Sequence, residues 1–249
     1  MHTLGIDLSA QPKKTAACTI AWSRQKARIS SLKVGLTDDE LVLLGEGVDK
    51  IGLDVPFGWP TKFVTTISIH HQRMTCEECS TQDFRFRATD QYVRSVTGKW
   101  PLSVSTDRIG IVALRAIRLL ENLAPETKVD RSGTGKTVEV YPAAVLIQWG
   151  FVNTSKKESQ ELAGTFLSQV SHWLQFAAGD ETLLIQNRDA LDALIACLVS
   201  RAVAVGLALP IPRENANDAS CEGWIALPLK DSLSRLLTTN FGSQIHLRA

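Results

Sequence analysis

Apolar residues in the first part of the chain fall into short runs separated by polar turns. These runs are rich in residues that suit β-strands, and they predict four strands, at residues 3–9, 15–22, 27–35 and 51–55. Pro56 ends the last run, because proline cannot donate to a strand ladder. Thr37 is followed by three acidic residues and predicts the N-terminus of a short helix that ends near Leu44.

Later in the chain, apolar residues recur every three to four positions, which is the spacing of an α-helix. The pattern predicts helices at residues 106–122, 142–149, 157–177 and 187–206. Apolar runs predict two further strands, at residues 137–141 and 222–228. Residues 60–105 mix His, Cys, Arg and aromatic side chains with weak periodicity, and we interpret them as a partly helical insertion.

The order of these elements predicts the fold class. Three antiparallel strands precede an alternation of helices and strands, which favours an α/β fold with a mixed β-sheet covered by helices on both faces. A chain of 249 residues suits one large domain, and we expect a single domain over residues 1–249. Crossover strands bring their ends to one edge of such a sheet, and sites favour that edge.

Composition narrows the choice of function only slightly. Hydrophobic residues make up 44% and charged residues 21%, as in an ordinary globular protein. The formal net charge is +1, so the bulk charge draws the chain neither to nucleic acid nor to an anionic membrane. Five cysteines in apolar contexts indicate reduced thiols, and no segment predicts a membrane span. We therefore expect a cytoplasmic protein with no membrane partner.

Two acidic residues end predicted strands. Asp7 lies in Gly5-Ile6-Asp7, and Asp54 lies in Gly52-Leu53-Asp54. A buried strand tolerates an ionised carboxylate only when something neutralises it, and a metal ion is one solution. A strand end open to water, or a capped turn, explains either residue alone. Two acids at matching strand ends shift the interpretation toward a site.

A second acidic pair lies on the last predicted helix. Asp189 and Asp192 are three residues apart, which places both carboxylates on one helical face. The positive end of the helix dipole explains Asp189 without a ligand, because it lies near the helix start. Asp192 lies among alanine and leucine residues, where solvation is poor. Asp7, Asp54, Asp189 and Asp192 together predict a site for Mg²⁺ or Mn²⁺.

Two further charged residues are candidates for catalysis. Glu139 lies inside the predicted strand at residues 137–141, where it is a metal ligand, a supporting group, a general base or simply a solvent-facing side chain. Arg87 lies in Arg85-Phe86-Arg87-Ala88-Thr89-Asp90. A guanidinium suits phosphate capture, and an ordinary surface salt bridge explains it equally well.

Other motifs favour no specific chemistry. The stretch Ser132-Gly133-Thr134-Gly135-Lys136-Thr137 lacks the first glycine of a phosphate loop and precedes a strand, so we interpret it as a flexible loop. Cys76 and Cys79 form a single pair, whereas a structural zinc site needs four ligands. Reduced thiols are the preferred interpretation. No arrangement typical of serine or cysteine hydrolases stands out.

The motifs together resemble a family of predicted ribonuclease H-like nucleases. The resemblance spans Thr3 to about Pro228 and rests on five motifs, Gly5-Ile6-Asp7, Gly52-Leu53-Asp54-Val55-Pro56, Arg87-x-x-Asp90, Glu139-Val140-Tyr141-Pro142 and Asp189-x-x-Asp192-Ala193. It implies a ribonuclease H-like fold in which Asp7 is the first-strand acid and Asp54 the crossover-strand acid. Asp189 and Asp192 are similar to the final-helix acids of Holliday-junction resolvases.

Three functions remain open at this point. The first is a metal-dependent nuclease that hydrolyses phosphodiester bonds in DNA or RNA with two Mg²⁺ or Mn²⁺ ions. Its expected catalytic residues are Asp7, Asp54, Glu139, Asp192 and Arg87. The second is a nucleotide-binding phosphotransferase of the actin and sugar-kinase type, and the third is a non-catalytic binding protein on the same fold. Nucleic acid is the expected partner, and assembly as a homodimer is left open.

Overall fold

The computed structural model describes residues 1–76, 78–125, 129–151 and 158–239. Its described strands form one mixed six-stranded sheet in the order β5-β4-β1-β2-β3-β6. Neighbouring pairs are parallel except β1–β2 and β2–β3, so β2 runs against the other strands. The strands are β1 (His2–Asp7), β2 (Ala16–Trp22), β3 (Ala27–Val34), β4 (Lys50–Asp54), β5 (Thr137–Glu139) and β6 (Leu174–Gln175).

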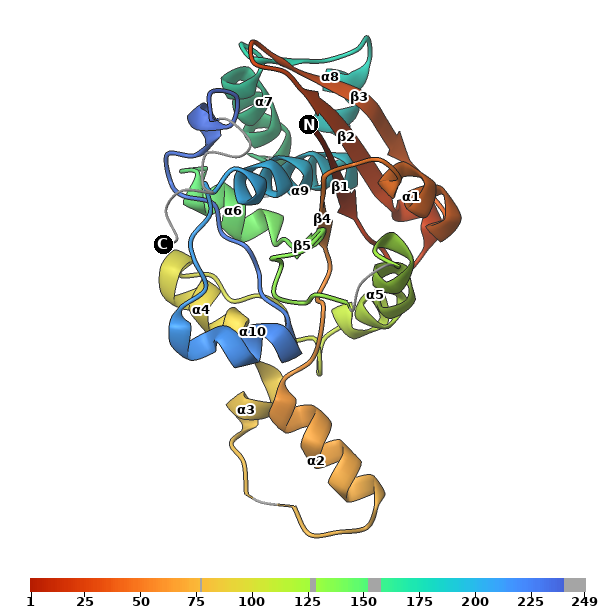
Figure 1. Ribbon diagram of the computed structural model, residues 1–249, viewed down its shortest axis with the longest axis vertical. Helices are drawn as coiled ribbons and strands as arrows, with labels where there is room; N and C mark the ends of the chain where they lie inside the picture. Colours follow the sequence, from red (N-terminus) through yellow and green to blue (C-terminus); the bar gives the residue numbers. More distant parts are fainter. Residues whose placement is uncertain (77, 126–128, 152–157, 240–249) are drawn as a thin grey trace.

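Helices cover both faces of this sheet (Figure 1). One face packs against α1 and α5, and the other packs mainly against α6, α7 and α9. The α/β layout with a mixed sheet is therefore confirmed. The described helices are α1 (Asp38–Gly45), α2 (Thr61–His71), α3 (Thr81–Arg85), α4 (Ala88–Thr97), α5 (Ile109–Leu123), α6 (Pro142–Gln148), α7 (Glu158–Val170), α8 (Asp180–Gln186), α9 (Arg188–Ala204) and α10 (Ala216–Glu222).

Local sequence signals explain where several elements begin and end. Thr37 and Glu40 form a capping box at the start of α1, with the Thr37 side chain accepting from the Glu40 N–H. Pro142 opens α6, where its missing N–H has no helical partner to lose. Asn187 caps α9 by accepting a hydrogen bond from the Ala190 N–H at 2.9 Å.

Two predicted elements are wrong in extent. The helix predicted at 157–177 ends at Val170, because the chain then turns and Leu174–Gln175 pair with β3 as a sixth strand. Trp173 stacks on Trp22 there, with ring centroids 5.8 Å apart, so its apolar character reflects sheet packing and not helix packing. The strand predicted at 222–228 is absent from the described sheet, because Glu222 ends α10 and the rest forms isolated bridges only, one of them from Glu139 to Ile225.

The described residues of the predicted insertion at 60–105 form three helices. Figure 1 shows α2 and α3 projecting beyond the body of the molecule, whereas α4 lies beside α10 and packs against it. Residues of α2 have no buried side chain, which explains their weak periodicity. Within the described parts of the chain, no helix is both long and apolar enough to cross a membrane.

Close contact between α9 and the sheet positions the site. A Cβ added at Gly5 would lie 2.1 Å from the Ala193 carbonyl oxygen, and one added at Gly52 would lie 2.3 Å from the Ala196 carbonyl oxygen. Only glycine therefore lets the α9 backbone rest directly on β1 and β4. The N-terminal turn of α9 consequently lies over the carboxyl ends of these two strands.

Candidate active site

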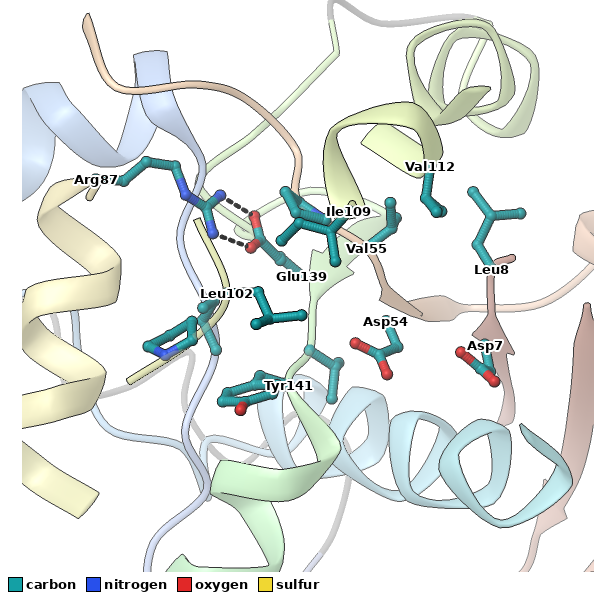
Figure 2. Close-up of a pocket in the computed structure, with 14 residues that line it drawn as sticks. Asp7, Leu8, Asp54, Val55, Arg87, Leu102, Ile109, Val112, Glu139 and Tyr141 are labelled. Carbon is teal, nitrogen blue, oxygen red and sulfur yellow. Dashed lines mark hydrogen bonds and ion pairs between the residues drawn. The ribbon is translucent and has the colours of Figure 1, made fainter. Parts of the chain in front are cut away.

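Two carboxylates lie next to each other at the ends of β1 and β4. Asp7 and Asp54 are Cα partners in the parallel pairing of these strands, which are spaced by about 4.8 Å. Side chains two residues apart on a strand share a face, so both acids lie on the face where Gly5 and Gly52 admit α9. Figure 2 shows the two carboxylates beside each other near the α9 ribbon.

The first turns of α9 supply the other predicted acids. Asp192 is largely buried, with 15% of its side chain exposed, and its Oδ2 accepts a hydrogen bond from Arg188 Nε at 2.8 Å. Its Oδ1 is buried and makes no hydrogen bond to any described residue. Asp189 is half-buried one turn earlier on the same helix. We call Asp7, Asp54 and Asp192 the carboxylate cluster, with Asp189 beside it.

Burial and mutual repulsion make the carboxylate cluster hard to ionise. Burial, followed by repulsion from Asp192 and Asp189, raises the pKa of Asp7 to about 8. Burial and then repulsion from Asp7 and Asp192 hold the pKa of Asp54 well above its usual range. Burial also raises the pKa of Asp192, although the neighbouring Arg188 opposes this shift. Arg188 is a cation that opposes the rise in pKa at all three acids but does not cancel it.

The carboxylate cluster opens into a cavity of about 240 Å³. Asp7 and Asp54 lie on its wall, and most of the remaining wall is apolar (Figure 2). The apolar and aromatic residues on the wall are Leu8, Val55, Pro56, Pro101, Leu102, Ile109, Val112, Val140, Tyr141 and Ile225.

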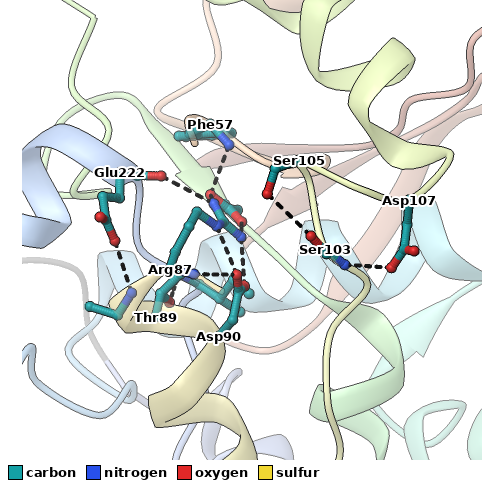
Figure 3. A network of polar contacts seen from close by, with 11 residues as sticks. Phe57, Arg87, Thr89, Asp90, Ser103, Ser105, Asp107 and Glu222 are labelled. Atoms are coloured by element: carbon teal, nitrogen blue, oxygen red, sulfur yellow. Dashed lines mark hydrogen bonds and ion pairs between the residues drawn. The ribbon is translucent and has the colours of Figure 1, made fainter. Parts of the chain in front are cut away.

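A second charged cluster lies on the same wall and is fully paired. Arg87 donates to both oxygens of Glu139, at 2.7 and 2.9 Å, and to both oxygens of Asp90, at 2.9 and 3.2 Å. Its remaining N–H donates to the Glu222 carbonyl oxygen at 3.2 Å, so all five guanidinium N–H groups are used (Figure 3). Arg87, Asp90 and Glu139 form what we call the arginine cluster.

These contacts change the roles expected for Arg87 and Glu139. Arg87 is 2% exposed and has no free donor, so its arrangement does not support phosphate capture and is not a surface salt bridge either. Glu139 Oε2 also accepts from the Phe57 N–H at 2.9 Å. Burial raises the pKa of Glu139, and Arg87 opposes the shift. Both oxygens of Glu139 are engaged, which suits a structural group better than a metal ligand or a base.

Sequence reasoning missed two contributors to this region. Arg188 precedes Asp192 by four residues on α9, a spacing at which helical side chains meet, and that was the available signal. Its two Nη groups make no hydrogen bond to any described residue. Glu222 is buried and accepts from the backbone N–H groups of Thr61 and Ala88, at 2.6 and 2.9 Å. No local pattern in the sequence marks that role.

The remaining sequence motifs do not join the site. Lys50 donates to the carbonyl oxygens of Gly133 and Gly135, so the glycine-rich loop that we expected to be flexible is anchored to β4. Among the residues that the structure describes, no three His, Cys, Asp or Glu side chains stand close enough to hold a metal ion.

Comparison with protein families gives a match over most of the chain. The family described as "Protein of unknown function (DUF429)" matches residues 5–217, which is most of the chain. The chain belongs to the DUF429 family. No curated protein and no solved structure matches it.

The DUF429 match includes both charged clusters. The four acids Asp7, Asp54, Asp189 and Asp192 lie inside the matched residues, and so does the whole arginine cluster. The match ends before Glu222, whose carboxylate joins the insertion to α10. Family membership therefore extends over the candidate site, and its chemistry has to be argued from the geometry.

Proposed function

We propose that this protein is a metal-dependent nuclease that hydrolyses phosphodiester bonds in nucleic acid, with Mg²⁺ or Mn²⁺ at the carboxylate cluster. The observation that carries the proposal is a pair of adjacent strand-end acids, Asp7 and Asp54, which repel Asp192 of α9 and are poorly neutralised by the protein. Buried carboxylates without enough partners are costly, and a divalent cation with oxygen ligands removes that cost.

The donor set fits a hard cation. Asp7 and Asp54 are next to each other on rigid strands, and the Asp192 Oδ1 has no partner among the described residues. Carboxylate oxygens of this kind are the ligands that Mg²⁺ and Mn²⁺ prefer. Asp189 is the fourth candidate ligand, three residues before Asp192 on α9. When bound, two such ions would activate a water and stabilise the leaving oxygen.

Arg188 is the residue that we assign to the substrate phosphate. It is 37% exposed, it lies next to the acids, and its Nη groups donate to none of the described residues. A guanidinium can make two parallel hydrogen bonds to a phosphate. Arg87, the residue expected from the sequence, holds Glu139 and Asp90 in place and thereby supports the wall of the cavity.

The placement of the acids also supports a ribonuclease H-like nuclease. The resemblance implies acids on the first strand, on the crossover strand and on the final long helix. Asp7 ends β1, Asp54 ends β4, and Asp192 lies on α9. The mixed six-stranded sheet is compatible with that fold. Fold analogy by itself does not establish chemistry, so the proposal rests on the carboxylate cluster.

Calorimetric titration with Mn²⁺ tests the metal site. We expect saturable binding to the wild type, loss of binding in Asp7→Asn, and normal binding in Asp39→Asn, which removes an exposed acid on α1. A cleavage assay with single-stranded and duplex DNA and RNA follows, with and without EDTA. Normal Mn²⁺ binding by Asp7→Asn, or cleavage that persists in EDTA, would overturn the proposal.

A further inference from the structure

The wall of the cavity beside the acids is unusual for a site that grips a nucleic-acid duplex. Among the described residues that line it, Arg87 is the only basic one, and its five N–H groups are already used. A protein that holds a duplex does so mainly with Lys and Arg against its phosphates. This cavity offers an apolar wall in the place where a duplex backbone would need cations.

The shape and chemistry of the cavity suit one small flat group. Its volume of about 240 Å³ lies below the common range for whole-ligand pockets, about 300–1,000 Å³. Ile109 and Val112 of α5 form one side, and Tyr141 supplies an aromatic ring (Figure 2). Unpaired nucleobases bind proteins by stacking on apolar and aromatic side chains of this kind.

Tyr141 gives the cavity a hydrogen-bonding group, and Leu102 lies at its opening to solvent. The Tyr141 hydroxyl makes no hydrogen bond to any described residue, and burial raises its pKa to about 12, so it stays a donor at neutral pH. Leu102 is 55% exposed although it lines the cavity. An exposed apolar side chain at the mouth of an apolar cavity gains burial when a ligand enters.

We propose that this cavity is a subsite for a single unpaired nucleobase, whose attached phosphate lies over the carboxylate cluster. The substrate is therefore single-stranded nucleic acid or a short nucleotide, and not the interior of a duplex. This inference rests on the proposed nuclease function and adds the class of substrate to it. The base enters past Leu102, lies between α5 and Tyr141, and receives a hydrogen bond from the Tyr141 hydroxyl.

The test compares matched variants of neighbouring residues on α5. Val112→Phe fills the cavity, whereas Ile111→Phe places the same phenyl ring at a side chain that is 65% exposed and outside it. With a ten-nucleotide single strand and Mn²⁺, we expect KM to rise about tenfold in Val112→Phe and to stay unchanged in Ile111→Phe. Wild type should cleave the same sequence as a duplex at least about tenfold less efficiently. Tyr141→Phe, a milder change, should raise KM about threefold.

Further measurements control for misfolding and distinguish the two possible substrates. Mn²⁺ titration and circular dichroism confirm that each variant keeps its metal site and fold. Cleavage of a dinucleoside monophosphate as efficiently as the ten-nucleotide strand would identify a short nucleotide as the substrate, and preference for the strand would identify single-stranded nucleic acid. Equal cleavage of duplex and single strand, with no effect of Val112→Phe or Tyr141→Phe, would overturn the subsite while leaving the nuclease proposal intact.

A failure of the proposed function has a different signature. In that case wild type cleaves no nucleic acid in the presence of Mn²⁺. Binding of adenosine or thymidine monophosphate by wild type, lost in Val112→Phe and kept in Ile111→Phe, would still support the base subsite.

Discussion

The carboxylate cluster and the arginine cluster both contribute residues to the wall of one cavity. They differ in how far the buried charge is neutralised by neighbouring groups. In the arginine cluster, one guanidinium uses all of its donors on two carboxylates and a carbonyl oxygen (Figure 3). In the carboxylate cluster, three acids share the influence of one half-exposed cation, and one buried oxygen has no partner among the described residues. Removing one partner of a paired buried charge is costly, whereas unpaired buried charge is kept at a stability cost and marks a candidate functional site.

Breaking the arginine cluster should produce the largest effect on stability. Arg87→Met leaves Glu139 and Asp90 buried without their cation, and we expect the free energy of unfolding to fall by about 3–5 kcal/mol. Urea unfolding followed by circular dichroism measures the change. Arg118→Met is the matched control, because its ion pair with Glu121 is exposed and worth little. Equal losses in the two variants would contradict the assignment of the arginine cluster to stability.

The positions of the four metal-site candidates were predictable because each lies on a simple element. Asp7 and Asp54 end apolar runs, and the i, i+3 spacing of Asp189 and Asp192 survives in α9. The sequence did not predict what the glycines at positions 5 and 52 do. Their role depends on the distance between α9 and the sheet, which no local pattern encodes.

Arg87 shows why roles are harder to predict than positions. Its partner Asp90 is three residues away and visible in the sequence, but Glu139 lies 52 residues further on and Glu222 later still. Whether a guanidinium is free for a phosphate depends on such distant partners. The sixth strand was missed for a similar reason, since two residues of edge pairing with β3 leave no periodic signal.

Removing one acid should affect the two clusters in opposite directions. In the metal-free protein, Asp7→Asn relieves repulsion, and we expect it to raise the free energy of unfolding by about 0.5–2 kcal/mol at pH 8. Asp90→Asn makes the same chemical change in the arginine cluster and should destabilise the protein, because Arg87 loses a charged partner. Urea unfolding in EDTA measures both. Destabilisation by Asp7→Asn would show that this carboxylate is compensated after all.

The stabilisation by Asp7→Asn should depend on pH with a definite sign. The folded pKa of Asp7 is about 8, above the value of about 3.9 in an unfolded chain, so the folded state binds more protons between these values. The wild type therefore loses stability relative to Asp7→Asn as pH rises from about 4 to about 8. Unfolding of both proteins in EDTA at pH 5.5 and 8.5 measures this difference, and a difference that does not grow with pH would contradict it.

The smallest stability effect is expected at Arg188, the residue that links the carboxylate cluster to solvent. Its ion pair with Asp192 is partly exposed, so Arg188→Gln should change the free energy of unfolding by only about 0–1 kcal/mol. Because Arg188 competes with a cation for Asp192, the variant should bind Mn²⁺ at least as tightly as wild type. It should nevertheless lose about tenfold in kcat/KM, since the phosphate loses a charged donor. Arg188→Lys should restore part of that loss by keeping the charge without the two-pronged geometry. Calorimetry and single-strand cleavage measure the two effects separately. Weaker Mn²⁺ binding with unchanged kcat/KM would mean that Arg188 orders Asp192 and does not contact the phosphate.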